Sequence, residues 1–120
     1  MSPRRSFFQR LTVNPHKLDA DELMGETAAL FCVPIDQLSA GEVGIVAGRL
    51  KSVVYNPRET VPTVEAQLYD GTASVELVWL GRRRITGIEP GRRLTARGRV
   101  GVHDGRLAIY NPWYSLRGTQ

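Results

Sequence analysis

Arginine is the residue type whose number and placement in this sequence point most directly to chemistry. Residues 81–120 carry nine arginines against two acids, a net charge of +7 in a chain whose total is +4. Guanidinium groups bind phosphate oxygens through paired N–H donors, so this concentration predicts contact with a polyanion. The alternative is a solvated basic face, because the chain has only two lysines and an arginine bias can reflect a GC-rich genome. The nine are Arg82, Arg83, Arg84, Arg92, Arg93, Arg97, Arg99, Arg106 and Arg117.

Side chains suited to catalysis are scattered. His16 and His103 lie far apart in the sequence and Cys32 is the single cysteine, so no zinc site of cysteine and histidine spacing can be assembled. The sequence has no Gly-rich phosphate loop with its lysine. Carboxylates that a metal-dependent nuclease would use are present, but their spacing does not distinguish them from solvated strand residues. They are Glu65, Asp70 and Glu76. The sequence therefore predicts a protein that is not an enzyme and needs no metal or cofactor.

Aromatic side chains could add base stacking to phosphate contact. Tyr69 and Tyr110 have outward parity on their expected strands, and they are the predicted stacking platforms. Trp79 shares its parity with neighbouring apolar residues and is expected in the core. Trp113 and Tyr114 follow the last expected strand, where they either stack on a ligand or fold back on the protein.

The elements that position these side chains follow from alternation of apolar and polar residues. Alternating runs separated by Asp-Gly pairs are typical of β-hairpins, and two such pairs occur, at 70–71 and 104–105. The sequence predicts five strands, over residues 42–55, 64–69, 75–80, 93–100 and 106–110. Glycine 48 inside the first run is expected to form a bulge, so that a long, bent first strand belongs to both halves of a closed sheet.

The fourth expected strand has the clearest pattern. Leu94, Ala96, Gly98 and Val100 share one face, which fits a barrel interior. The other face holds Arg93, Thr95, Arg97 and Arg99. Like charges on alternate positions repel, and either Glu65 and Glu76 on neighbouring strands or a bound phosphate backbone would relieve that repulsion.

The first 40 residues are predicted to form an arm and a helix. Asp19 can cap the helix and Glu22 completes a capping-box pattern, after which an apolar stripe continues until Val33-Pro34 ends it. Residues 41–114 would then form the main domain and 115–120 a tail. Phe7 and Phe8 in the arm are expected to cover an apolar surface of this domain or of a partner.

Composition places limits on the class of protein. A chain of 120 residues with 42% hydrophobic content is expected to form one domain with a modest core. The single cysteine favours a reducing compartment, and the N-terminus lacks the apolar region of a signal peptide. No apolar run is long enough to cross a membrane. We therefore expect a cytoplasmic protein that does not bind membranes.

Five strands with a short connector after the third, preceded by a helix, resemble the OB-fold, a Greek-key barrel that binds oligonucleotides and oligosaccharides. A closer resemblance covers residues 41–114 and depends on the order of several motifs. Over this stretch the chain resembles the wedge domain of RecG-type branched-DNA helicases and a set of small actinobacterial OB-fold nucleic-acid-binding proteins. The motifs are Tyr69-Asp70-Gly71-Thr72, Leu77-Val78-Trp79-Leu80, Pro90-Gly91-Arg92-Arg93-Leu94, Gly98-Arg99-Val100, Gly105-Arg106-Leu107 and Asn111-Pro112-Trp113-Tyr114.

The chain departs from the wedge pattern at the positions that touch bases. In RecG-type wedges an aromatic follows the tryptophan of the third strand and another lies four residues beyond it. Leu80 and Arg84 occupy these positions here. The resemblance therefore implies salt-sensitive phosphate contact rather than splitting of a DNA fork.

Together these features predict an all-β OB-fold module that binds nucleic acid without catalysis, single-stranded DNA or RNA rather than duplex. The predicted phosphate contacts are Arg49, Lys51, Arg82, Arg83, Arg84, Arg97 and Arg99, with Tyr69 and Tyr110 as base platforms. The alternative is a protein-interaction module that binds a partner, or a second copy, through the barrel and the N-terminal arm and helix.

Overall fold

The computed structural model describes residues 31–117. They form a short 3₁₀ helix and six strands, and no helix in this part of the chain is long and apolar enough to cross a membrane. The predicted helix from Asp19 and the arm with Phe7 and Phe8 lie outside the described residues. The elements are η2 (Ile35–Gln37), β1 (Val43–Asn56), β2 (Thr63–Tyr69), β3 (Ser74–Leu80), β4 (Arg93–His103), β5 (Arg106–Tyr110) and β6 (Trp113–Arg117).

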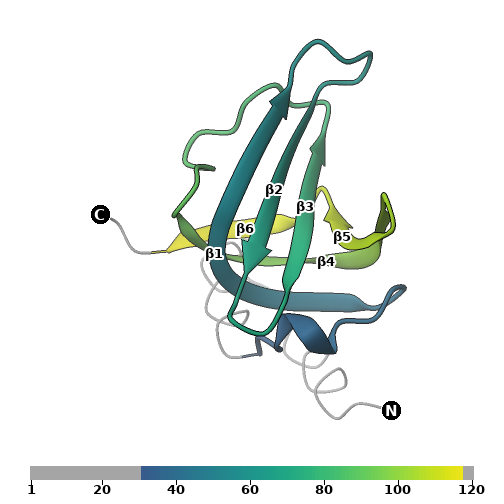
Figure 1. The fold of residues 1–120 in the computed structure, drawn as a ribbon, viewed down its shortest axis with the longest axis vertical. Helices are drawn as coiled ribbons and strands as arrows, with labels where there is room; N and C mark the ends of the chain where they lie inside the picture. The colour runs from purple at the N-terminus through teal and green to yellow at the C-terminus, as the bar shows by residue number, and fades with distance from the viewer. Residues whose placement is uncertain (1–30, 118–120) are drawn as a thin grey trace, which may run out of the picture.

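Five of the strands form a sheet that closes on itself. The strands follow the order β1-β2-β3-β5-β4, and β4 pairs back onto β1. In Figure 1, β1, β2 and β3 rise side by side while β4 and β6 cross them near the base. All pairs are antiparallel except β3 with β5. The five predicted strands and the closure of the sheet are confirmed.

The sixth strand was not predicted. The chain turns at Asn111, which has a positive φ of 49°, and β6 then continues alongside the first half of β4. Tyr114 and Leu116 alternate toward the core and pack against it, whereas Trp113 and Arg117 belong to the other face. This alternation was visible in the sequence, but the Asn-Pro pair before it is typical of a strand end.

The bend of β1 is what closes the sheet. Residues 43–49 pair with β4 and residues 49–56 pair with β2, so the strand changes partners at Arg49. The predicted bulge at Gly48 is wrong, because the irregularity lies two residues later, between Leu50 and Ser52. Gly48 has a different role. A Cβ at this position would collide with the backbone carbonyl of Tyr69, so only glycine lets β2 approach the bend.

The core lies inside the closed sheet and is built from the inward positions of every strand. Leu94, Ala96 and Val100 of β4 are buried there, as predicted, and Trp79 is 4% exposed with its ring edge-on to Tyr114 at 5.6 Å. Thr95, expected on the outward face, is also buried, with 1% exposure. The outward face of β4 is therefore not uniformly open to solvent.

The connector between β3 and β4 closes one end of the core. Ile85 and Ile88 are buried in the core cluster, and the connector is fastened at both ends by backbone hydrogen bonds. Gly81 donates to the carbonyl of Pro62 at 2.7 Å, and Gly91 donates to that of Leu50, also at 2.7 Å. Between these points the chain exposes three consecutive arginines, Arg82, Arg83 and Arg84.

Candidate nucleic-acid interface

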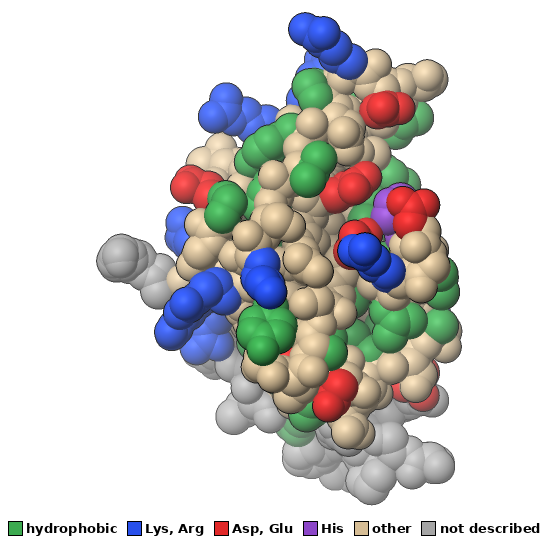
Figure 2. Space-filling view, viewed as in Figure 1, with side chains coloured by type: hydrophobic (Ala, Val, Ile, Leu, Met, Phe, Trp, Pro, Cys, Tyr) green, Lys and Arg blue, Asp and Glu red, His purple; other side chains and the backbone are tan. Residues whose placement is uncertain are grey.

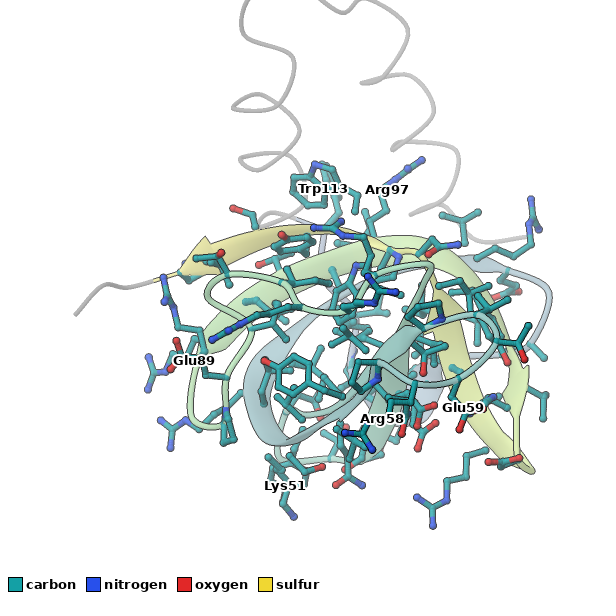
Figure 3. All side chains as sticks on the ribbon, turned by 90° about the horizontal axis from the view of Figure 1, so that it is seen from above. Lys51, Arg58, Glu59, Glu89, Arg97 and Trp113 are labelled. Atoms are coloured by element: carbon teal, nitrogen blue, oxygen red, sulfur yellow. The ribbon has the colours of Figure 1, made fainter. Side chains whose placement is uncertain are left out.

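The basic side chains singled out in the sequence do not converge on one surface. Lys51 and Arg97 point to opposite sides of the molecule in Figure 3. Figure 2 shows basic side chains gathered toward the left of the view, whereas at the right a histidine lies beside acidic side chains. The predicted residues therefore divide into groups with different surroundings.

The most concentrated group crosses the sheet at the bend of β1. Arg49 of β1 lies directly opposite Arg93 of β4, and Arg93 lies directly opposite Arg117 of β6. On the other side, Arg49 lies opposite Tyr69 of β2. We call these four residues the basic row. Partners in such pairs have Cα atoms about 5 Å apart, so the three arginines span about 10 Å.

All four residues of the basic row are exposed. Within residues 31–117, none of its three arginines forms an ion pair with a carboxylate. Like charges directly opposite each other on neighbouring strands repel. The arrangement is therefore suited to an anion lying across the strands. Arg49 and Tyr69 were predicted site residues, whereas Arg93 and Arg117 were noted only for their charge.

Lys51 extends the basic row beside Tyr69. Its Nζ lies 4.8 Å from the centre of the Tyr69 ring, a cation–π contact, and the Tyr69 hydroxyl donates to the Gly71 carbonyl at 3.3 Å. Tyr69 is 40% exposed, as its predicted outward parity requires. One face of the ring already carries a cation, so a stacked base would share the ring with Lys51 or displace it.

Arg97 and Arg99 differ from the basic row. Arg97 is half-buried and lies opposite Ile45 on one side and Trp113 on the other. Arg99 is exposed, but its Nη1 donates to the backbone carbonyl of Gly41 at 2.6 Å, which ties it to the start of β1. Arg97 is thus less accessible than the basic row, and Arg99 has a hydrogen bond to the backbone that no arginine of the basic row forms within residues 31–117.

Glu65 and Glu76 face other partners than the arginines of β4. His103 Nε2 lies 3.7 Å from Glu65 Oε2, 4.0 Å from Glu76 Oε1 and 3.6 Å from Asp104 Oδ2. Arg106 lies 3.7 Å from Glu76 Oε2. We call Glu65, Glu76, His103 and Asp104 the acidic cluster. Of the two alternatives that the sequence left open for relieving the repulsion on β4, the glutamates are not the one found, because Glu65 and Glu76 pair with His103 and Arg106 instead.

Tyr110, the second predicted base-stacking residue, lies next to the acidic cluster and contacts His103. Its hydroxyl lies 2.9 Å from His103 Nδ1, and the two rings meet edge to face with centroids 5.8 Å apart. In the sequence His103 has no apparent partner, because it lies far from His16 and from Cys32. No sequence signal linked it to Glu65 and Glu76, because the parallel β3–β5 pairing that brings the β4–β5 hairpin to these strands joins segments far apart in the chain.

Cys32 and Asp70, the other side chains that could be reactive, are held by their neighbours in the fold. Burial raises the pKa of the Cys32 thiol, and nearby Arg117 opposes that shift only in part, so the thiol is held protonated at neutral pH. Burial acts to raise the pKa of Asp70 as well. Hydrogen bonds from Thr72, Ile35 and Ala73 outweigh it and hold that pKa below its usual value. Within residues 31–117, no group of three or more histidine, cysteine or carboxylate side chains is arranged to hold a metal ion.

Comparisons with known proteins identify the fold but no family. No protein-family model matches the chain, and no curated protein matches it. Among solved structures, RecG bound to a three-way DNA junction is similar with a TM-score of 0.61 and 21% identity, over 72% of this chain and 12% of the RecG chain. The HINb domain of p204 is similar with a TM-score of 0.58 and 16% identity, over 88% of this chain and 56% of that one.

A third similar structure is described as structural mimicry for functional antagonism, with a TM-score of 0.56, 13% identity, and coverage of 72% of this chain and 44% of that one. This chain therefore spans from about one eighth to little more than half of the three similar chains. At these identities the likeness supports the OB type of fold that the strand order indicates.

Proposed function

We propose that this chain is a non-catalytic OB-fold module that binds nucleic acid, single-stranded rather than duplex. The observation that carries the proposal is the basic row, in which Arg49, Arg93 and Arg117 stand side by side on three strands. Phosphate groups are the abundant anions that would lie across such a row. RecG, which is similar in fold, was solved bound to a DNA junction, and this agrees with a nucleic-acid ligand.

The position of the basic row differs from the usual binding surface of this fold. OB-folds bind oligonucleotides on the face of their second and third strands. Here the outward side chains of that face include Glu65 and Glu76, which would repel phosphates. The proposed path instead crosses the bend of β1, where Gly91 at the end of the connector donates to Leu50. The exposed arginines 82–84 follow Gly81 at the other end of the connector, which donates to Pro62.

The preference for a single strand follows from the size and chemistry of the basic row. Three arginines over about 10 Å match a few nucleotides of one backbone. Tyr69 at the end of the row offers an aromatic ring for one unpaired base, a contact worth about 1–3 kcal/mol in single-strand binders. A duplex would keep its bases away from that ring.

The direct test is fluorescence anisotropy of a labelled oligo-dT across a salt series, with the matching dT–dA duplex alongside. Binding should weaken with log[salt] at a slope of about −0.7 for each phosphate contacted. The triple variant R49Q/R93Q/R117Q should lose most of the affinity and flatten the slope. Arg106→Gln is the matched control, because Arg106 is also an exposed strand arginine but lies beside Glu76. Absence of binding at low salt, or equal losses for Arg93→Gln and Arg106→Gln, would refute the proposal.

A further inference from the structure

The outward face of β1, β2, β3 and β5 carries carboxylates and exposed apolar side chains, whereas the basic row carries arginines. Val54 of β1 lies opposite Glu65 of β2, Glu65 lies opposite Val78 of β3, and Val78 is paired with Tyr110 of β5. Val54 is 49% exposed and Tyr110 is 37% exposed. Leu80, 45% exposed, lies further along β3 on the same face. Exposed apolar side chains therefore border the carboxylates of the acidic cluster.

The carboxylates on this face have acceptor capacity to spare. Their contacts with His103 and Arg106 are 3.6 to 4.0 Å long, which is beyond hydrogen-bond distance. Glu76 Oε1 is shielded from solvent and accepts no hydrogen bond from any residue between 31 and 117. A carboxylate can accept about four hydrogen bonds, and an incoming guanidinium offers five donors in a planar fork. Glu65 Oε2 accepts from Asn56 Nδ2 and from Thr63 Oγ1, each at 3.5 Å, which is the long end of the hydrogen-bond range. Glu65 and Glu76 therefore keep acceptor capacity for an incoming donor.

We infer that this face, defined by Val54, Glu65, Glu76, Leu80 and Tyr110, binds an arginine-bearing, partly apolar segment of a protein partner. The negative charge of the face favours a cationic protein segment as its ligand. Carboxylates attract a cationic segment and repel phosphate, while the exposed valine, leucine and tyrosine contact apolar side chains of the same segment. The inference does not rest on the proposed nucleic-acid function, because it uses a separate surface.

The two surfaces would let one small domain hold two kinds of partner at once. The basic row crosses the bend of β1, whereas the acidic cluster lies between β2, β3 and the β4–β5 hairpin. In Figure 2 most of the basic side chains in view lie toward the left, whereas the histidine and its acidic neighbours lie toward the right. Arg106 is the basic residue that lies beside Glu76. Oppositely charged surfaces on one domain keep each ligand away from the site of the other.

The experiment is an amide NMR titration of the whole chain with a synthetic peptide of alternating arginine and valine. Amide shifts should cluster at Val54, Glu65, Glu76, Leu80 and Tyr110. A peptide with glutamate in place of arginine should produce none, which separates charge recognition from simple apolar adhesion. Because the mapping uses the unmodified protein, it does not depend on the folding of any variant.

Variants then measure the contribution of the carboxylates. E65Q/E76Q should weaken binding of the arginine peptide by roughly tenfold or more. D36N/E89Q, which removes the same charge from exposed positions in η2 and the connector, should change it less than twofold. Shifts spread over the basic row, equal losses in both double variants, or oligo-dT shifts at the same five amides would overturn the inference. The last outcome would assign the face to nucleic acid instead.

Discussion

Arg49 of β1 and Arg93 of β4 face each other directly across the pair of strands that closes the sheet. Arg93 has a second arginine, Arg117, on its other side. A guanidinium between two others of the same charge raises the free energy of the folded protein, and a bound anion removes that cost. Stability and binding should therefore respond in opposite directions to a change at position 93.

Arg93→Gln should raise the free energy of unfolding at low salt by about 0.5 kcal/mol while it weakens oligonucleotide binding. Thermal unfolding and anisotropy on the same sample test both effects. Arg99→Gln is the comparison on the same strand. Arg99→Gln removes the hydrogen bond from the guanidinium to the Gly41 carbonyl, and this should lower stability instead. If both variants lose stability, the arginines of the basic row have a structural role and the repulsion argument fails.

Asp70 should make the folding free energy sensitive to acid. Its Oδ2 accepts from the backbone N–H of Ile35 at 2.8 Å and its Oδ1 accepts from that of Thr72 at 2.9 Å, so it joins η2 to the β2–β3 turn. Because these bonds hold its pKa below the usual value, their stabilisation is complete above the unfolded-state pKa. It is lost as the pH falls through the lower, folded-state pKa.

Asp70→Asn replaces one acceptor oxygen with a donor and should cost about 1 kcal/mol at neutral pH. It should also flatten the fall in stability as the pH drops through the folded-state pKa of Asp70. Urea unfolding at several pH values measures both effects. Asp36→Asn changes an exposed carboxyl group of η2 nearby and should leave the curve unchanged. If the unfolding free energy of the Asp70→Asn variant falls with pH in parallel with that of the unmodified protein, Asp70 is not the source of the acid sensitivity.

Gly48→Ala should destabilise the fold by about 2 kcal/mol or more, because the new methyl group meets the backbone of Tyr69, which cannot move without opening the β1–β2 pair. Gly101→Ala in β4 is a matched control. There an added Cβ would lie 3.9 Å from the Tyr110 ring, an ordinary contact. Alanine should be neutral or stabilising at position 101. Equal effects at the two sites would show that β2 does not approach the bend as closely as described.

Asn111 should hold the junction of β5 and β6 through two separable contributions. Its Oδ1 accepts from the N–H of Leu80 at 2.9 Å, and its φ of 49° is one that asparagine and glycine tolerate. We expect stability to fall in the order Asn111→Asp, Asn111→Gly, Asn111→Ala, with about 1 kcal/mol between successive variants. Hydrogen exchange at Leu80 should speed up in the glycine and alanine variants and not in the aspartate variant.

Five of the six strands, and the faces on which most of their side chains lie, could be predicted from the sequence. Period-2 alternation and Asp-Gly turns located all five predicted strands, and parity placed Trp79, Leu94 and Val100 in the core and Tyr69 and Tyr110 on the surface. These properties are local, since successive side chains of a strand point to opposite faces whatever the partner strand is. Parity could also have revealed β6, whose residues alternate in the same way.

The charged side chains that became neighbours could not be predicted from the sequence, because the tertiary structure brings them together. Register between strands far apart in the chain brings Arg49, Arg93 and Arg117 into one row and places His103 against Glu65 and Glu76. Parity assigns a side chain to the inside or the outside of a closed sheet, but it does not say where around the circumference the side chain lies. Bending of β1 and closure onto β4 set that position, and they divide an overall basic protein into one basic and one acidic surface.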